Sequence, residues 1–334
     1  MTPPLAPDFR PQYHQLHRVG RPGIWRSLVG SALVLLLVFL VVPAAAGLAF
    51  FVGLMATGRT SAEAAATLDV TTETTPTGLA LLNIVIAAAI PITLLVTWWL
   101  HRLKPRWVSS VAPRLRWGYL LVCLLLSVVA LTASLLVGLL LPLAPGEAPV
   151  GELNDFTTRT RDFLLVIALL TPLQAAGEEY LFRGYLTQAF GSLVWGRRLS
   201  QTLAVLVPAL VFALLHGLSQ DAPVFFDRFA FGVVAGILVI RTGGLEAGIA
   251  MHVMNNFVAF GLALAFGDLT TALTASGGSS WWMIASTLTQ SLVYLALASW
   301  VASAMGLATT GPPVGGALPP PGARPELVGP PPRV

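Results

Sequence analysis

The chain alternates between long apolar runs and short polar stretches. Several runs reach the roughly 20 residues that a helix needs to cross a bilayer. We therefore predict an all-α, polytopic membrane protein with about eight transmembrane helices, the first of them kinked at Pro43. The predicted spans are residues 27–56, 78–100, 117–143, 162–190, 199–218, 226–242, 245–266 and 281–305.

The spans divide the chain into five parts. Residues 1–26 are polar and Pro-rich and are expected to form an N-terminal tail. Three helices occupy 27–143, a helical core occupies 162–266, and the last helix occupies 281–305. Pro, Gly and Ala dominate 306–334, which predicts a disordered tail.

Composition and charge agree with a membrane protein. Hydrophobic residues make up 55% of the chain and charged residues 10%, whereas soluble domains have about 25% charged residues. Cytoplasmic loops carry the excess of Lys and Arg. With both termini placed in the cytoplasm, fourteen of these cations lie inside and four outside, with Arg183 set aside as intramembrane. Both termini are therefore predicted to be cytoplasmic.

The net charge of +4 then reflects topology and attraction to the lipid bilayer, and we expect no nucleic-acid partner. Cys123 is the single cysteine, so no disulfide can form within the chain. Lys104 is the only lysine, and this preference for arginine hints at a bacterial source with a GC-rich genome.

Three ionisable residues interrupt an apolar run at membrane depth. They are Glu178, Glu179 and Arg183, and each such charge costs roughly 2.5–3.5 kcal/mol on insertion scales. In a helix, Glu179 and Arg183 stand at i and i+4 with the acid first, which is the favourable order for an ion pair. Glu178 points about 100° away and has no expected partner within its own segment. Such a carboxylate suits a general base.

Two later spans add further polar residues. His216 lies in the fifth span with Phe212 one turn before it, and His252 lies in the seventh with Asn256 one turn after it. Asn255 is an equally eligible neighbour on sequence grounds. Polar side chains in spans are rare and usually face a bundle interior or a wet cavity. Together with the two glutamates, these polar residues indicate an active site more strongly than a purely structural role in helix packing.

The depths of the two histidines conflict if the helices are straight. At about 1.5 Å per residue, His216 falls toward the outer end of its span and His252 toward the cytoplasmic end of its own. Tilt, kinks at Pro172 and Pro208, or a broken helix must therefore bring them together.

The order of these motifs resembles a known family. Glu178-Glu179-x-x-x-Arg183, Phe212-x-x-x-His216 and His252-x-x-x-Asn256 are similar to the three motifs of the CAAX protease and bacteriocin-processing (CPBP, Abi) family of intramembrane endopeptidases. The resemblance covers roughly residues 162–266. It implies that Glu178 and His216 activate water and that His252 and Asn256 form an oxyanion hole, with the Glu179–Arg183 pair and Phe212 in support.

The residues also leave the mechanism open between a carboxylate base and a metal. Amide hydrolysis needs a base for water and donors for the oxyanion. Two imidazoles with a carboxylate form a zinc-type set, whereas a lone carboxylate is a weak activator of water. We therefore lean toward Zn²⁺ bound by His216 and His252, and expect no other cofactor.

Two further functions compete with an endopeptidase acting on a membrane protein or peptide. A transporter or proton-coupled carrier would use buried Glu and His as a proton relay, but we find no internal repeat of the kind that transporters usually show. A catalytically inactive scaffold of the same family is the other alternative. If the chain is bacterial, a leader peptide or another membrane protein is a better substrate candidate than a prenylated protein.

Overall fold

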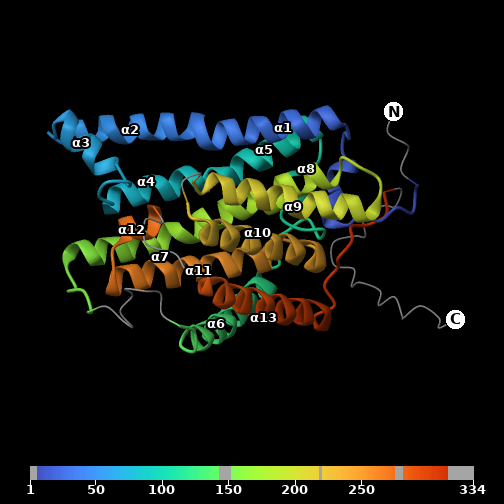
Figure 1. Cartoon of the computed structure of the whole chain (residues 1–334). Coiled ribbons are helices and arrows are strands. Elements are labelled where there is room, and N and C mark those ends of the chain that lie inside the picture. The colour runs from blue at the N-terminus through green and yellow to red at the C-terminus, as the bar shows by residue number, and fades with distance from the viewer. Residues whose placement is uncertain (1–5, 143–151, 218–219, 275–280, 315–334) are drawn as a thin grey trace.

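The protein is a bundle of long helices with both described ends of the chain at the same end of the bundle (Figure 1). The structure is a computed structural model and describes residues 6–142, 152–217, 220–274 and 281–314. Within these residues, eight helical stretches are long and apolar enough to span a membrane, which confirms the predicted all-helical, multi-pass fold. They are Ile24–Ala56, Pro76–His101, Trp117–Gly138, Thr158–Gly191, Arg197–Leu215, Ala222–Thr242, Glu246–Phe266 and Trp282–Ala304.

The first two of these stretches are each divided into successive elements. The first stretch comprises α1 (Ile24–Leu36), the π-helical turn η2 (Leu37–Val41) and α2 (Val42–Ala56). Pro43 is the second residue of α2, just after the π turn, as expected for a residue that lacks an N–H and crowds the preceding turn. The second comprises α4 (Pro76–Ala87) and α5 (Ala89–His101).

The stretch with the two glutamates is also divided. It comprises α7 (Thr158–Glu179), a second π-helical segment η4 (Tyr180–Leu186) and α8 (Thr187–Gly191). The spans after it are α9 (Arg197–Leu215), α10 (Ala222–Thr242), α11 (Glu246–Phe266) and α13 (Trp282–Ala304), and α6 (Trp117–Gly138) precedes it. The shorter elements are η1 (Tyr13–Arg18), α3 (Ser61–Leu68), η3 (Pro105–Val108) and α12 (Leu269–Thr274).

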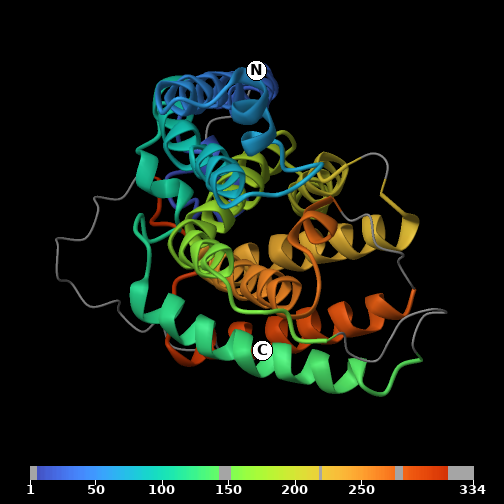
Figure 2. The same ribbon diagram turned by 90° about the vertical axis from the view of Figure 1, so that its left-hand side faces the viewer.

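Helix α7 occupies the middle of the arrangement. It packs against α4 on one side and α11 on the other, while α10 packs on α9. Helices α6 and α13 lie side by side along the edge opposite α1 and α2 (Figure 2). The largest buried cluster of apolar side chains joins η4 to α9, α10 and α11 through Phe182, Phe212, Phe231 and Met251. The polar residues singled out from the sequence therefore sit on the helices that enclose the core.

The two segments expected to be tails contact each other. Part of the N-terminal segment folds as η1, with Tyr13 and His14 buried. Gln12 forms an isolated antiparallel bridge with Thr310, and the N–H of Gly311 donates to the carbonyl of Pro11 over 2.8 Å. Residues 306–314 of the expected disordered tail are thus ordered by pairing with the N-terminal segment, and 315–334 lie outside the described residues.

Candidate active site

The two glutamates close α7 at the point where the helix changes its geometry. Glu178 and Glu179 are its last two residues, and the π-helical η4 that carries Arg183 follows at once. Single π turns inside longer helices are frequent at functional sites. The preceding Gly177 lets α7 approach α4, because a Cβ at this position would lie 2.4 Å from the carbonyl oxygen of Ile86.

Glu179 forms the ion pair predicted from its spacing. Its Oε1 lies 3.0 Å from Nη1 of Arg183, with both side chains almost fully buried. The same oxygen lies 3.0 Å from Nδ1 of His252. The guanidinium carbon of Arg183 stands 4.4 Å from the centre of the Phe212 ring. One buried carboxylate thus connects all three motifs.

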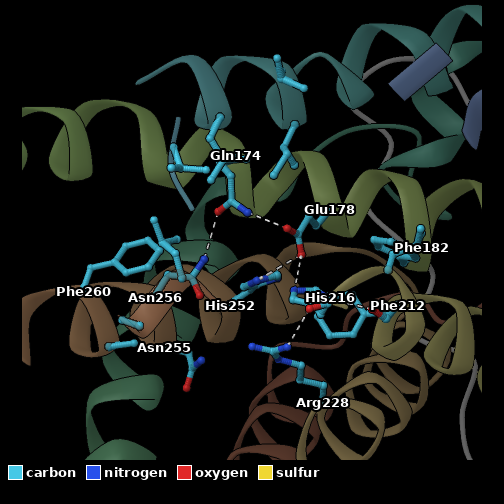
Figure 3. Close-up of a pocket in the computed structure, with 18 of the residues that line it drawn as sticks. Gln174, Glu178, Phe182, Phe212, His216, Arg228, His252, Asn255, Asn256 and Phe260 are labelled. Carbon is cyan, nitrogen blue, oxygen red and sulfur yellow. Dashed lines mark hydrogen bonds and ion pairs between the residues drawn. The ribbon is translucent and has the colours of Figure 1, made fainter. Parts of the chain in front are cut away.

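Glu178 faces the cavity with one oxygen and the protein with the other. Its Oε1 accepts a 2.6 Å hydrogen bond from Nε2 of Gln174, four residues earlier on α7. The prediction that Glu178 has no partner within its own segment was therefore wrong. Its Oε2 has no hydrogen-bond partner among the described residues and lies 3.6 Å from Nε2 of His252 and 4.0 Å from Nε2 of His216. Figure 3 shows both rings turned toward this oxygen.

His216 follows the last residue of α9 and is held by two backbone contacts. Its Nδ1 lies 2.8 Å from the carbonyl oxygen of Phe212. Because a carbonyl only accepts, Nδ1 carries a proton and Nε2 of the neutral ring is a bare acceptor toward the cavity. The His216 carbonyl accepts from Nη1 of Arg228 over 3.2 Å. The rings of Phe212 and His216 are 4.3 Å apart between centres, so Phe212 packs under the histidine as expected.

His216 and His252 lie at similar depths in the bundle despite the predicted conflict. The reason is that α9 is displaced along the bundle relative to α11. In Figure 1, α9 extends further than α11 toward the end where the chain termini lie. A residue at the far end of α9 can therefore meet His252, which lies near the start of α11. The structure brings Glu178, His216 and His252 together, as the motifs predicted.

The two neighbouring asparagines have different partners. Nδ2 of Asn256 donates to Oε1 of Gln174 over 3.0 Å, whereas Oδ1 of Asn255 accepts from Nε2 of Gln290 over 3.5 Å. Both line the cavity, but only Asn256 is connected through Gln174 to Glu178. Sequence reasoning missed Gln174, although it is a polar residue one turn before Glu178 in an apolar span.

These residues border a cavity of about 670 Å³ with two different walls (Figure 3). The polar wall comes from α7, α9, α10 and α11. The opposite wall is apolar and comes from η2, α2 and α4, through Phe39, Pro43, Leu82, Val85 and Ile86. Leu68 on α3 and Leu273 on α12 extend the lining toward the end of the bundle remote from the termini. Such a cavity can hold an apolar group on one side and polar atoms on the other.

His216 and His252 are the predicted metal ligands of this site. Within the part of the chain that the structure describes, no three or more His, Cys, Asp or Glu side chains are grouped so that they could hold a metal ion. Catalytic zinc sites usually have three protein ligands. The prediction of Zn²⁺ at His216 and His252 stays a prediction, and the chemistry considered below uses only side chains of this chain.

A known protein family matches the part of the chain that holds the site. Residues 160–258 match the family described as Type II CAAX prenyl endopeptidase Rce1-like. This stretch contains all three motifs, from Glu178 to Asn256.

Two curated proteins are similar over parts of the chain. "Uncharacterized protein YyaK" of Bacillus subtilis (strain 168) is 27% identical over 159 residues, which are 45% of this chain and 52% of that protein. "Uncharacterized 24.3 kDa protein" of Escherichia coli is 32% identical over 90 residues, which are 27% of this chain and 38% of that protein. The chain thus spans about half the length of the first relative and less of the second. No solved structure matches it.

Proposed function

We propose that this protein is an intramembrane endopeptidase, because residues 160–258 match the family described as Type II CAAX prenyl endopeptidase Rce1-like. It hydrolyses a peptide bond of a membrane-associated protein or peptide. The observation that carries the proposal is the free oxygen of a buried carboxylate, Glu178 Oε2, set against two imidazoles at the edge of a cavity. Buried polar atoms are usually hydrogen-bonded, so an unpaired carboxylate oxygen that faces two imidazoles at a cavity calls for a functional explanation.

Glu178 acts as the general base together with His216. Glu178 Oε2 and His216 Nε2 are both acceptors and lie 4.0 Å apart. A water molecule can donate one proton to each from a position beside both groups. Glu178 takes a proton from that water while the water oxygen bonds to the carbonyl carbon of the substrate. The protonated Glu178 then delivers the proton to the amide nitrogen, and the carbon–nitrogen bond breaks.

Asn256 and His252 stabilise the oxyanion that forms after the water attacks and before the carbon–nitrogen bond breaks. Asn256 Nδ2 has two N–H groups, of which one is donated to Gln174. The other is available to the carbonyl oxygen of the substrate. His252 donates Nδ1–H to Glu179, so donation from Nε2 into the cavity requires the doubly protonated ring. Removing one donor of this kind costs about 10²–10³ in kcat in well-studied enzymes.

The cavity supports a substrate with a large apolar surface. Its wall on η2, α2 and α4 presents only apolar or small side chains, such as Phe39, Leu82 and Ile86. A leader peptide or a segment of another membrane protein would suit this wall. Such a substrate would present its backbone carbonyl to the polar side.

The test is cleavage of a quenched fluorescent peptide library by the purified full-length protein in lipid nanodiscs. We expect Glu178→Gln to abolish turnover while leaving the protein folded and extractable, because only the base is lost. Glu73→Gln is the matched control, since Glu73 is 71% exposed and pairs with Arg159 away from the cavity. Equal turnover by wild type and Glu178→Gln would reject the assignment, and a wild type without turnover on any peptide would favour the inactive scaffold.

A further inference from the structure

Gln174 stands between the proposed base and the proposed oxyanion donor. It lies one turn before Glu178 on α7, and its side chain is buried. Its Nε2 donates to Glu178 Oε1 over 2.6 Å and its Oε1 accepts from Asn256 Nδ2 over 3.0 Å. Figure 3 shows the Gln174 side chain bridging the two, with Glu178 on α7 and Asn256 on α11.

The direction of these hydrogen bonds follows from the chemistry of the groups. An ionised carboxylate only accepts, so Gln174 must turn its NH₂ toward Glu178. Its oxygen then points to Asn256 and can only accept, so Asn256 must turn its own NH₂ inward rather than its oxygen. The ionised Glu178 carboxylate thereby determines, through Gln174, that Asn256 turns its NH₂ group rather than its oxygen toward the glutamine.

The geometry points to Gln174 as a positioning residue that orients the Asn256 amide for the oxyanion. This inference rests on the proposed function, because it gives Asn256 its donor role. With Gln174 in place, one Nδ2 hydrogen of Asn256 is fixed on the glutamine and the second is held in a defined direction. Without it, the amide can rotate about its last torsion and present its oxygen, which would repel the oxyanion.

Asn255 differs from Asn256 in its hydrogen-bond partner. It also lines the cavity, yet its oxygen meets Nε2 of Gln290 at 3.5 Å, a long hydrogen bond to a helix that does not carry the base. Only Asn256 is bonded to a side chain that is itself oriented by Glu178. The structure thus distinguishes two asparagines that are equivalent on sequence grounds.

The test is a double-mutant cycle with Gln174→Met and Asn256→Ala in the full-length protein. Methionine keeps the unbranched shape of glutamine but offers no amide. We expect Gln174→Met to lower kcat at least tenfold with KM within twofold of wild type, because the donor acts on the transition state. In the Asn256→Ala background the same substitution should lower kcat less than threefold. An equal fold-loss in both backgrounds would overturn the inference.

Gln290→Met is the matched control, since Gln290 is also a buried glutamine bonded to an asparagine of α11. It should change kcat less than twofold, and a tenfold loss would show that the effect at Gln174 is not particular to its position. The four proteins of the cycle are also compared by thermal unfolding, which does not depend on turnover.

Gln174→Met should lower the unfolding temperature by less when Asn256 is already Ala, because the two side chains are directly bonded. Equal shifts would overturn the inference even if no peptide is cleaved. Loss of turnover in Glu178→Gln with full turnover in Gln174→Met would leave the proposed function intact and refute only the role of Gln174.

Discussion

Glu179 contributes more to the stability of the fold than the neighbouring Glu178. Its Oε1 faces both Arg183 and His252, and the side chain is fully buried. Gly248 on α11 packs against its other oxygen so closely that a Cβ there would lie 2.6 Å from Oε2. Neutralising this carboxylate leaves a buried guanidinium without its counter-ion.

We therefore expect Glu179→Gln to destabilise the protein by about 3–5 kcal/mol, the usual cost of breaking a buried ion pair from one side. The measurement is thermal unfolding of the purified protein, with Glu178→Gln as the control. Within the described residues Glu178 forms no ion pair with an arginine, so its substitution should cause a smaller shift. Equal unfolding temperatures for wild type and Glu179→Gln would contradict the structural role of the pair.

The choice between a carboxylate base and a metal is tested at the same scale. If Glu178 works as a free base, wild-type protein should keep its turnover after exhaustive chelation, because no bound ion is needed to acidify the water. The measurement is metal content by mass spectrometry on wild type and His216→Ala purified in parallel, together with the rate before and after chelation. Loss of activity on chelation, recovery with Zn²⁺ and a lower zinc content in His216→Ala would instead support zinc.

Among the elements, η1 combines burial with titratable groups outside the spans. His14 is fully buried, and burial together with Arg18 and Arg197 lowers its pKa from 6.5 to about 4. Burial also lowers the pKa of His17, which stacks on His101 with 3.8 Å between ring centres. Between about pH 6.5, where an unfolded histidine titrates, and pH 4, the unfolded chain binds more protons at His14. Stability from this residue is complete above pH 6.5 and falls as the pH drops.

The unfolding temperature should therefore be lower at pH 5.0 than at pH 7.5. In His14→Leu this difference should shrink, because the variant has no proton to take up on unfolding at this position. Gln15→Leu is the control, since Gln15 is buried in the same element but does not titrate. A pH dependence that is unchanged in His14→Leu would show that other groups are responsible.

The contact between α9 and α10 depends on two glycines one turn apart. A Cβ at Gly232 would lie 2.9 Å from the Cβ of Ala209, and one at Gly236 would lie 3.2 Å from Cγ1 of Val205. The small residues thus allow close helix packing. This packing holds His216 at the end of α9 next to Arg228 on α10.

Gly232→Leu should consequently destabilise the protein by about 1–3 kcal/mol through overpacking. Gly53→Leu on α2 is the control, because a side chain at Gly53 would meet nothing within 4 Å. Both proteins are compared by thermal unfolding in the same detergent. A loss at Gly53 as large as that at Gly232 would mean that helix propensity or solubility, rather than the α9–α10 contact, causes the effect.

For the whole molecule, the distribution of Lys and Arg predicts the orientation in the membrane. Reporter fusions after Gly20, Leu103 and Gly315 should all report the cytoplasm, because cations collect in these segments. A fusion within the polar loop 57–77 should report the opposite side. A periplasmic signal after Leu103 would refute the orientation.

The spans and the main site residues were predictable because each leaves a strong local signal. A run of about 20 apolar residues has few alternatives to a membrane helix, and charged or imidazole side chains stand out within it. Gln174 carries no charge and gave no such signal, and its role depends on a partner 82 residues away. The displacement of α9 and the packing of η1 depend on contacts between segments that are distant in the sequence. Such contacts cannot be inferred from the residue pattern of a single segment.

The apolar wall of the cavity lies on η2, α2 and α4, outside the family match at residues 160–258, while Glu178, His216 and His252 lie within it. Under the proposed function, hydrolysis and selection of the polypeptide depend on separate stretches of sequence, which are free to diverge at different rates. Residues 160–258 would then determine which kind of bond is hydrolysed. The helices that precede them would determine which polypeptide is admitted.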